Sequence, residues 1–188
     1  NKGLKSILLL SIPSAAGLVV LSEPVIRTIF QWSKGFYPEY VTLASRILVF
    51  FSVALITQSI VATMSRAFYA VNDTKSPLYV GAGTILMNLA ICYLFYRYTS
   101  LGVEGMALAY SITSTINAFI LIFILNKKVD SINLKSFCVF LLKTFLASGI
   151  MGLAVFLLSN VMDFNTASKF LQVLYLIAAI SVGTLIYF

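Results

Sequence analysis

Six long stretches without a charged residue divide this chain, and they constrain its fold more than any other feature. The stretches are residues 6–22, 47–65, 76–96, 105–126, 144–162 and 170–188. Each has about 17 to 22 residues, which at about 1.5 Å of helical rise per residue matches the roughly 30 Å hydrocarbon core of a bilayer. They predict about six membrane-spanning helices.

The composition independently places most of the surface in lipid. Hydrophobic residues make up 60% of the chain and charged residues only 10%, with a mean hydropathy of +0.99. A soluble domain typically carries about a quarter charged residues because its surface faces water. Strands of a membrane barrel would be about ten residues long with alternating polarity. We therefore expect an all-α, polytopic bundle of transmembrane helices.

The basic residues lie in the connections between these stretches, so the net charge of +7 does not indicate nucleic-acid binding. If the spans alternate in direction, one side of the membrane receives Lys2, Lys5, Arg66, Lys75, Lys127, Lys128, Lys135 and Lys143, and the other receives Arg27, Lys34, Arg46, Arg97 and Lys169. By the positive-inside rule, the first of these sides is predicted to be cytoplasmic.

The chain begins with Asn1 and ends within an apolar run, and we expect it to be a fragment of a longer protein. Its opening resembles a signal peptide, but the length of the first apolar run and the further spans favour a retained first helix. The connections are too short to hold a soluble domain, which predicts a single bundle.

The sequence offers no catalytic or metal-binding constellation. It has no histidine, Cys92 and Cys138 form no CxxC pair, and neither a GxSxG motif nor a phosphate-binding glycine loop occurs. The centres of the spans also lack ionisable residues, which usually mark ion or proton paths in membranes. We therefore expect no enzyme and no cofactor, and the coupling ion of any transport is left open.

Two features stand out in the first span. Glu23 and Arg27 lie four residues apart near its outer end and share one helix face. They form either a mutually satisfied pair that anchors the helix at the interface, or a pair that lines an outward-opening cavity. Pro13 removes one backbone hydrogen bond and marks either a packing kink or a hinge.

The second span carries a polar stripe. Ser52, Ser59, Thr63 and Arg66 lie along one helical face, with Gln58 beside it. Hydroxyl groups facing lipid would lack partners, so this face is predicted to point toward neighbouring helices or a water-filled cavity. The fourth span has a similar small-residue face, where close packing is expected: Ser111, Ser114, Thr115 and Ala118, with Asn117 adjacent.

Polar residues are most concentrated in the connection "SRAFYAVNDTKSPLYV", residues 65–80. Ser76 and Pro77 in this connection predict a helix start. Serine can cap the first backbone N–H groups, and proline at the first helical position loses no hydrogen bond.

The same connection resembles the segment RAFYA-x-x-D-T-K/R-T-P that joins two helices in the MurJ-type lipid II flippases of the MOP transporter superfamily. Here it reads "RAFYAVNDTKSP". The resemblance includes "IPSAAGLVVLSEPVIRTIF" and "LGVEGMALAYSITSTINAFIL" and covers residues 4–125, whereas from residue 137 onward only the number and placing of spans agree. The chain departs from the family's Phe-Glu-Arg-Gly-x-Phe loop, which here reads "FQWSKGF" without the acidic residue.

This resemblance implies a bacterial inner-membrane transporter with two helical lobes around a central cavity. Residues 1–128 would supply four helices of the second lobe, and residues 129–188 two additional helices. The implied partners are membrane lipids and lipid II, the peptidoglycan precursor linked to undecaprenyl pyrophosphate, which is moved by alternating access. The alternatives are another MOP exporter, for a polysaccharide-linked lipid or a drug, and a non-transporting scaffold for cell-wall enzymes.

The connection at residues 65–80 is then a candidate cytoplasmic gate. Arg66 continues the polar stripe to the membrane surface, and Asp73 is expected to accept hydrogen bonds from Thr74 or nearby backbone and to pair with Lys75 or Arg66. The alternative is a turn that only orients two helices and anchors them to lipid headgroups.

Overall fold

The structure is a computed structural model that describes residues 2–30, 38–129, 134–161 and 169–187. Within these residues it contains the helices α1 (Lys2–Val20), α2 (Ser22–Phe30), α3 (Pro38–Ala70), α4 (Lys75–Tyr98), α5 (Gly102–Val129), α6 (Leu134–Val161) and α7 (Lys169–Tyr187). Six of them are long and apolar enough to cross a membrane. The predicted all-α fold with about six spans is confirmed.

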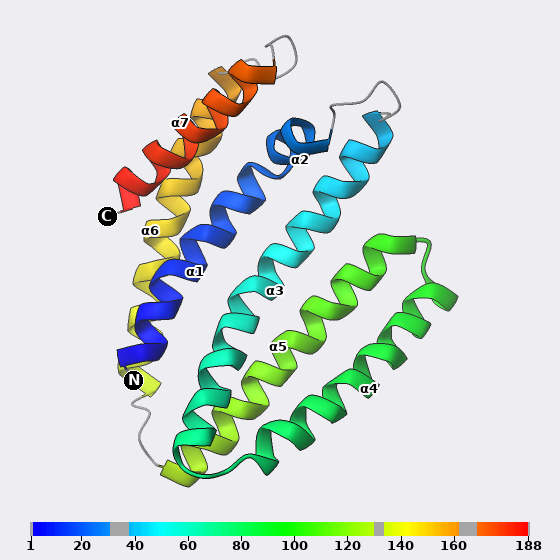
Figure 1. The fold of residues 1–188 in the computed structure, drawn as a ribbon, viewed down its shortest axis with the longest axis vertical. Coiled ribbons are helices and arrows are strands. Elements are labelled where there is room, and N and C mark those ends of the chain that lie inside the picture. Colours follow the sequence, from blue (N-terminus) through cyan, green and yellow to red (C-terminus); the bar gives the residue numbers. More distant parts are fainter. Residues whose placement is uncertain (1, 31–37, 130–133, 162–168, 188) are drawn as a thin grey trace.

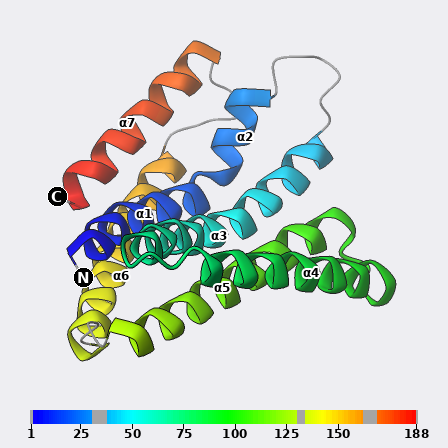
Figure 2. The ribbon, with the colours of Figure 1, turned by 60° about the horizontal axis from the view of Figure 1, so that its bottom comes forward.

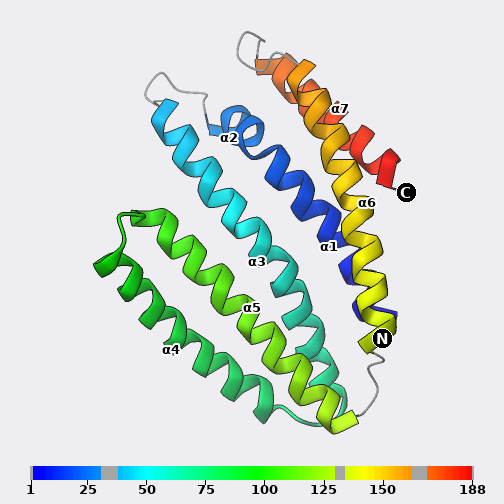
Figure 3. The ribbon, with the colours of Figure 1, turned by 180° about the vertical axis from the view of Figure 1, so that it is seen from behind.

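The spanning helices pack side by side in an order that differs from their order in the chain. In space they follow one another as α4, α5, α3, α1, α6 and α7 (Figures 1 and 3). The short helix α2 packs against α3 and α7 (Figure 1). A tilted view places α7 and α2 on one side of α1 and α3, and α4 and α5 on the other (Figure 2). As a result, α3 packs extensively on α5 but has little direct contact with α4.

The helix ends sort as the alternating spans predict. The start of α1, the end of α3, the start of α4 and the end of α5 lie at one end of the molecule (Figure 1). We call this the cytoplasmic end, in keeping with the predicted orientation, and the opposite end the outer end. The cluster at residues 65–80 therefore lies at the cytoplasmic end.

Two helices extend well beyond the uncharged stretches that predicted them. Helix α3 has 33 residues and includes both Arg46 and Arg66, and α6 begins at Leu134 rather than at residue 144. About 20 residues suffice to cross the hydrocarbon core, so the ends of such helices continue among the headgroups, where charges are solvated. Lys143 of α6 is exposed, and its long side chain can reach the interface.

The first predicted span ends two residues earlier than expected because the chain turns at Leu21. Pro24 has no N–H to donate to the carbonyl of Val20, so α1 does not continue straight into the next turn. The expectation that Glu23 and Arg27 occupy the outer end of the first span is therefore wrong, because both lie on the separate helix α2.

A packed core lies toward the cytoplasmic end, where α1, α3, α5 and α6 meet. Its buried members are Leu4, Leu8, Ile12, Met64, Phe68, Leu121, Leu125 and Phe137. The faces that point away from this core remain apolar and exposed, including most of α4, which has no buried residue. Lipid tails are as apolar as leucine, so close packing rather than water exclusion holds such helices together.

Candidate functional site

The turn between α3 and α4 is closed by backbone hydrogen bonds. Asn72 has a φ of 57°, in the left-handed region that asparagine tolerates better than most residues. This conformation lets the N–H of Asp73 donate to the carbonyl of Phe68 at 2.9 Å and the N–H of Asn72 donate to that of Tyr69 at 3.1 Å. The two bonds are the Schellman pattern that ends a helix. Because Phe68 is fully buried, the turn is fixed to the core.

Asp73 connects this turn to two further helices. Its Oδ1 accepts a hydrogen bond from the N–H of Ser76 at 3.1 Å, and so caps the first turn of α4. Its Oδ2 forms an ion pair with Lys128 in the last turn of α5. The hydrogen bond from Lys128, followed by that from Ser76, holds the pKa of the Asp73 carboxyl well below its ordinary value.

The ionic partner of Asp73 differs from the predicted one. The sequence favoured Lys75 or Arg66, but both of these side chains are exposed, and Lys128 holds the carboxylate from 55 residues away. Helix α5 packs beside α3, and this packing brings the end of α5 to the turn. The predicted helix start at Ser76 also differs, because α4 begins at Lys75 and is capped by Asp73.

The polar stripe of α3 divides into a packed part and an open part. Each of its three hydroxyls donates to the carbonyl four residues earlier in the helix, at 2.8 to 2.9 Å. Ser52 is only 1% exposed, whereas Ser59 and Thr63 are half-buried and Arg66 is exposed. The exposure of the stripe thus increases toward the cytoplasmic end. We call Ser59, Thr63 and Arg66, which are not fully covered by other described helices, its open part.

Interhelical hydroxyl bonds join the buried side of α3 to α5. The hydroxyls of Thr57 and Ser114 are 2.7 Å apart in the buried interface. Ser111 donates to the backbone carbonyl of Phe50 at 2.6 Å. The expected close packing of the small-residue face of α5 is confirmed at these two serines. Thr57 was not predicted to take part, because it lies outside the predicted stripe.

Two amides also bond between helices. Gln58 Nε2 donates to the hydroxyl of Tyr110 on α5 at 2.6 Å. Asn88 Nδ2 of α4 donates to Thr113 Oγ1 on α5 at 3.0 Å. Gln58 therefore contributes to the contact of α3 with α5, and its position beside the polar stripe is the signal that singled it out.

At the outer end, two ion pairs lie on the described helices. Arg27 donates to Glu23 Oε1 from both Nε, at 2.9 Å, and Nη2, at 2.6 Å, so the predicted mutual pairing within α2 is confirmed. Nη1 of Arg46 on α3 lies 3.7 Å from Oε1 of Glu104 in the first turn of α5. The second pair was not predicted, because its partners lie on helices whose proximity cannot be read from the sequence.

An open crevice of about 740 Å³ lies between the end of α3 and the first turns of α4. It is lined by Ser65, Tyr69, Thr74, Lys75, Pro77, Leu78, Gly81, Ala82 and Ile85. Its polar members come from the end of α3, the turn and the start of α4, and its apolar members all lie on α4. Of the predicted site residues, the structure brings Lys75 to this crevice.

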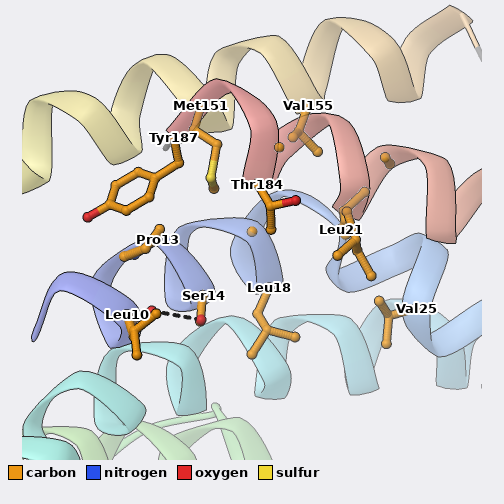
Figure 4. A pocket seen from close by; sticks show the side chains of 14 residues that line it. Leu10, Pro13, Ser14, Leu18, Leu21, Val25, Met151, Val155, Thr184 and Tyr187 are labelled. Atoms are coloured by element: carbon orange, nitrogen blue, oxygen red, sulfur yellow. Dashed lines mark hydrogen bonds between the residues drawn. The ribbon is translucent and has the colours of Figure 1, made fainter. Parts of the chain in front are cut away.

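A second, mostly apolar cavity of about 280 Å³ lies between α1, α6 and α7 (Figure 4). Pro13, Met151 and Tyr187 are among its lining residues. In the described part of the chain, no three His, Cys, Asp or Glu side chains come together as a metal site. The candidate functional features are thus the polar face of α3, the charged turn and this apolar cavity.

Most of the sequence matches the model of a known protein family. A family model described as "Lipid II flippase MurJ" matches residues 1–176. The chain belongs to the MurJ lipid II flippase family. Together with the six apolar spans among the described residues, this membership makes it a multi-pass protein of the bacterial inner membrane.

Curated MurJ relatives and a solved MurJ structure agree with this membership. The chain is 29% identical over 187 residues to a probable lipid II flippase MurJ of Haemophilus influenzae, covering 98% of this chain and 36% of the relative. It is 35% identical over 125 residues to the lipid II flippase MurJ of Thermosipho africanus, covering 65% of this chain and 25% of the relative. A structure of a lipid II flippase MurJ in an inward closed conformation matches all of this chain and 36% of its own length, with 29% identity and a TM-score of 0.78.

The chain therefore spans about a third or less of the length of these MurJ relatives. The MurJ resemblance recognised in the connection at residues 65–80 is confirmed, and the family match also includes the region after residue 137, where the sequence alone showed only the placing of spans.

Proposed function

We propose that this chain forms part of a flippase that moves lipid II across the bacterial inner membrane by alternating access. In this proposal residues 1–128 supply four membrane-spanning helices of the second transporter lobe, and residues 129–188 supply two additional ones. The proposal rests on the family membership together with the open part of the α3 stripe. It names no coupling ion.

The open part of the stripe suits the polar part of such a substrate. Ser59 and Thr63 are half-buried and Arg66 is exposed one turn further along the helix. A guanidinium can donate two parallel hydrogen bonds to a phosphate, which makes arginine a strong pyrophosphate ligand. We assign the first contact with the pyrophosphate, at the cytoplasmic end, to Arg66. Ser59 and Thr63 then form part of the wall of the passage.

The charged turn supports this role by keeping Arg66 in place. Asp73 fixes the turn to α4 and α5, so the end of α3 moves with its neighbours rather than separately. Lys75 lines the crevice beside the turn and offers a second cation to headgroups. At the outer end, Glu23 and Arg27 satisfy each other, and we assign them an anchoring role at the interface.

The apolar part of the substrate needs a different surface. The cavity between α1, α6 and α7 is mostly apolar and opens among helices whose outer faces are exposed leucines and phenylalanines. We assign the undecaprenyl tail to this side of the molecule, because an acyl-like chain and such faces are mutually compatible.

The experiment that tests the proposal is lipid II translocation in proteoliposomes that contain the protein as the cell makes it. Arg66→Ala should lower the rate about tenfold or more, since a charge-assisted contact contributes about 1.5 to 3 kcal/mol. Arg97→Ala is the matched control, because Arg97 is exposed at the outer end of α4. Equal rates for the two variants would refute the role of Arg66. A wild-type protein that moves a drug or another lipid-linked saccharide but not lipid II would refute the flippase assignment itself.

A further inference from the structure

The proline in α1 leaves a backbone carbonyl without its helical partner. Pro13 lies inside α1 and has no N–H, so it cannot donate to the carbonyl of Leu9, four residues earlier. In a bilayer no water replaces the lost bond, and an unpaired carbonyl in the hydrocarbon region is costly. Another donor must reach the Leu9 carbonyl if it is to be satisfied at this point of α1.

A side chain from the far end of the chain supplies this donor. The hydroxyl of Tyr187, in the last turn of α7, donates to the carbonyl of Leu9 at 2.8 Å, across 178 residues of sequence. The ring of Tyr187 lies next to Pro13 (Figure 4). The bond therefore reaches the carbonyl that the proline leaves unpaired.

The neighbouring hydroxyls are already committed to their own helices. Ser14 donates to the carbonyl of Leu10 at 2.7 Å (Figure 4), and Thr184 donates to that of Ser181 at 2.8 Å. Both residues line the same apolar cavity as Tyr187. Among the described residues that line this cavity, Tyr187 is the side chain that reaches Leu9.

The surroundings leave room for α1 to change shape at Pro13. The cavity of about 280 Å³ lies beside Pro13, lined by α1, α6 and α7, although α1 and α6 pack directly on each other elsewhere. Helix α7 packs chiefly on α6 and has little other contact with α1. The Tyr187–Leu9 hydrogen bond is thus a specific polar link between α7 and α1, which are otherwise loosely packed against each other.

We propose that Tyr187 is a positioning residue that latches α7 to α1 at Pro13 and sets the conformation of α1 there. The latch makes the geometry of α1 depend on the position of α7. A displacement of α7 removes the donor and frees the segment around Pro13 to bend. This inference goes beyond the proposed flippase function, because it holds whichever lipid the protein moves.

The test uses the fact that alanine at position 13 restores the missing N–H. The Tyr187→Phe variant, which removes only the hydroxyl, should speed amide hydrogen exchange in residues 9–17 by roughly three- to tenfold, the effect of losing one hydrogen bond. In the Pro13→Ala background the same change should have no effect, because residue 13 then bonds to Leu9 itself. Exchange is measured by mass spectrometry on the whole protein in lipid nanodiscs.

Tyr79→Phe serves as the matched control, because Tyr79 is an exposed tyrosine on α4. It should leave exchange in residues 9–17 unchanged. The latch is refuted if Tyr187→Phe leaves exchange in this segment unchanged, or speeds it equally with proline and with alanine at position 13. If Tyr187→Phe fails to fold, recovery of folding in the Pro13→Ala/Tyr187→Phe protein supports the latch, and failure of both variants refutes it.

Discussion

Asp73 and Lys128 form an ion pair that ties the turn between α3 and α4 to the last turn of α5. At the other end of α5, Glu104 lies 3.7 Å from Arg46 of α3. Between these pairs, buried hydroxyl bonds join the same two helices. Helices α3 and α5 are therefore linked along their whole shared length, and we expect them to move as one unit.

The Asp73–Lys128 pair predicts a non-additive pair of substitutions. Asp73→Asn keeps a capping side chain for α4 but loses the charge, and Lys128→Met loses the same ion pair. Each should lower the thermal unfolding midpoint in detergent by a similar amount, and the double variant should be no worse than either one. Asp73→Ala should be worse than Asp73→Asn, because it also removes the cap. Additive effects would show that the two side chains act separately.

The same pair predicts a pH dependence of stability. The pKa of Asp73 is lowered in the folded protein from its ordinary value of 3.8, so ionised Asp73 stabilises the fold above that pH. The contribution is lost only as the pH falls below 3.8 toward the lowered pKa. The stability difference between wild type and Asp73→Asn should thus be constant from about pH 5 to 8 and shrink below about pH 4. Thermal unfolding across this range measures it, and a difference that disappears near neutral pH would contradict the assignment.

The buried hydroxyl pair between α3 and α5 predicts a modest loss of stability. Thr57→Val keeps the shape of the side chain but leaves Ser114 without its interhelical partner. The expected cost is about 0.5 to 1.5 kcal/mol. Ser181→Ala is the control, because Ser181 is an exposed serine of α7 that bonds only within its own helix. Chemical or thermal unfolding in detergent compares the two, and an equal cost would show that the interhelical bond adds nothing.

How much of this architecture was predictable depends on how local its causes are. The number of spans follows from the uncharged stretches, because the thickness of the bilayer sets the length of each one. The polar stripe of α3 follows from helical periodicity. The break at Leu21 was missed, although Pro24 was its signal.

The long-range partners could not be predicted from the sequence. The sequence favoured Lys75 or Arg66 as partners of Asp73 because they lie close to it along the chain, and only the packing of α5 beside α3 brings Lys128 to the carboxylate. The bond from Tyr187 to the carbonyl of Leu9 depends in the same way on how α7 folds back beside α1. Spatial order differs from chain order in this fold, so neighbours along the chain are poor guides to contacts.

The glycines of α4 and α7 predict opposite effects of alanine. A Cβ at Gly81 would meet nothing within 4 Å, whereas one at Gly183 would lie 3.0 Å from Cγ2 of Val155, which is buried and has a stiff, β-branched side chain. Gly183→Ala should cost about 1 to 3 kcal/mol by overpacking α7 against α6. Gly81→Ala should stabilise the protein by up to about 1 kcal/mol through helix propensity. Unfolding midpoints of the two variants in detergent measure these effects. Shifts in the same direction would contradict this packing.

The most direct test of the central claim is the water accessibility of the α3 stripe in intact membranes. The account predicts that Ser59→Cys and Thr63→Cys, in the half-buried part of the stripe, react with a membrane-impermeant maleimide from the cytoplasmic side, and that the buried Ser52→Cys does not. Added lipid II should slow both reactions. If Ser59→Cys and Thr63→Cys react only with a membrane-permeant reagent, these positions face lipid rather than a passage, and the account is wrong.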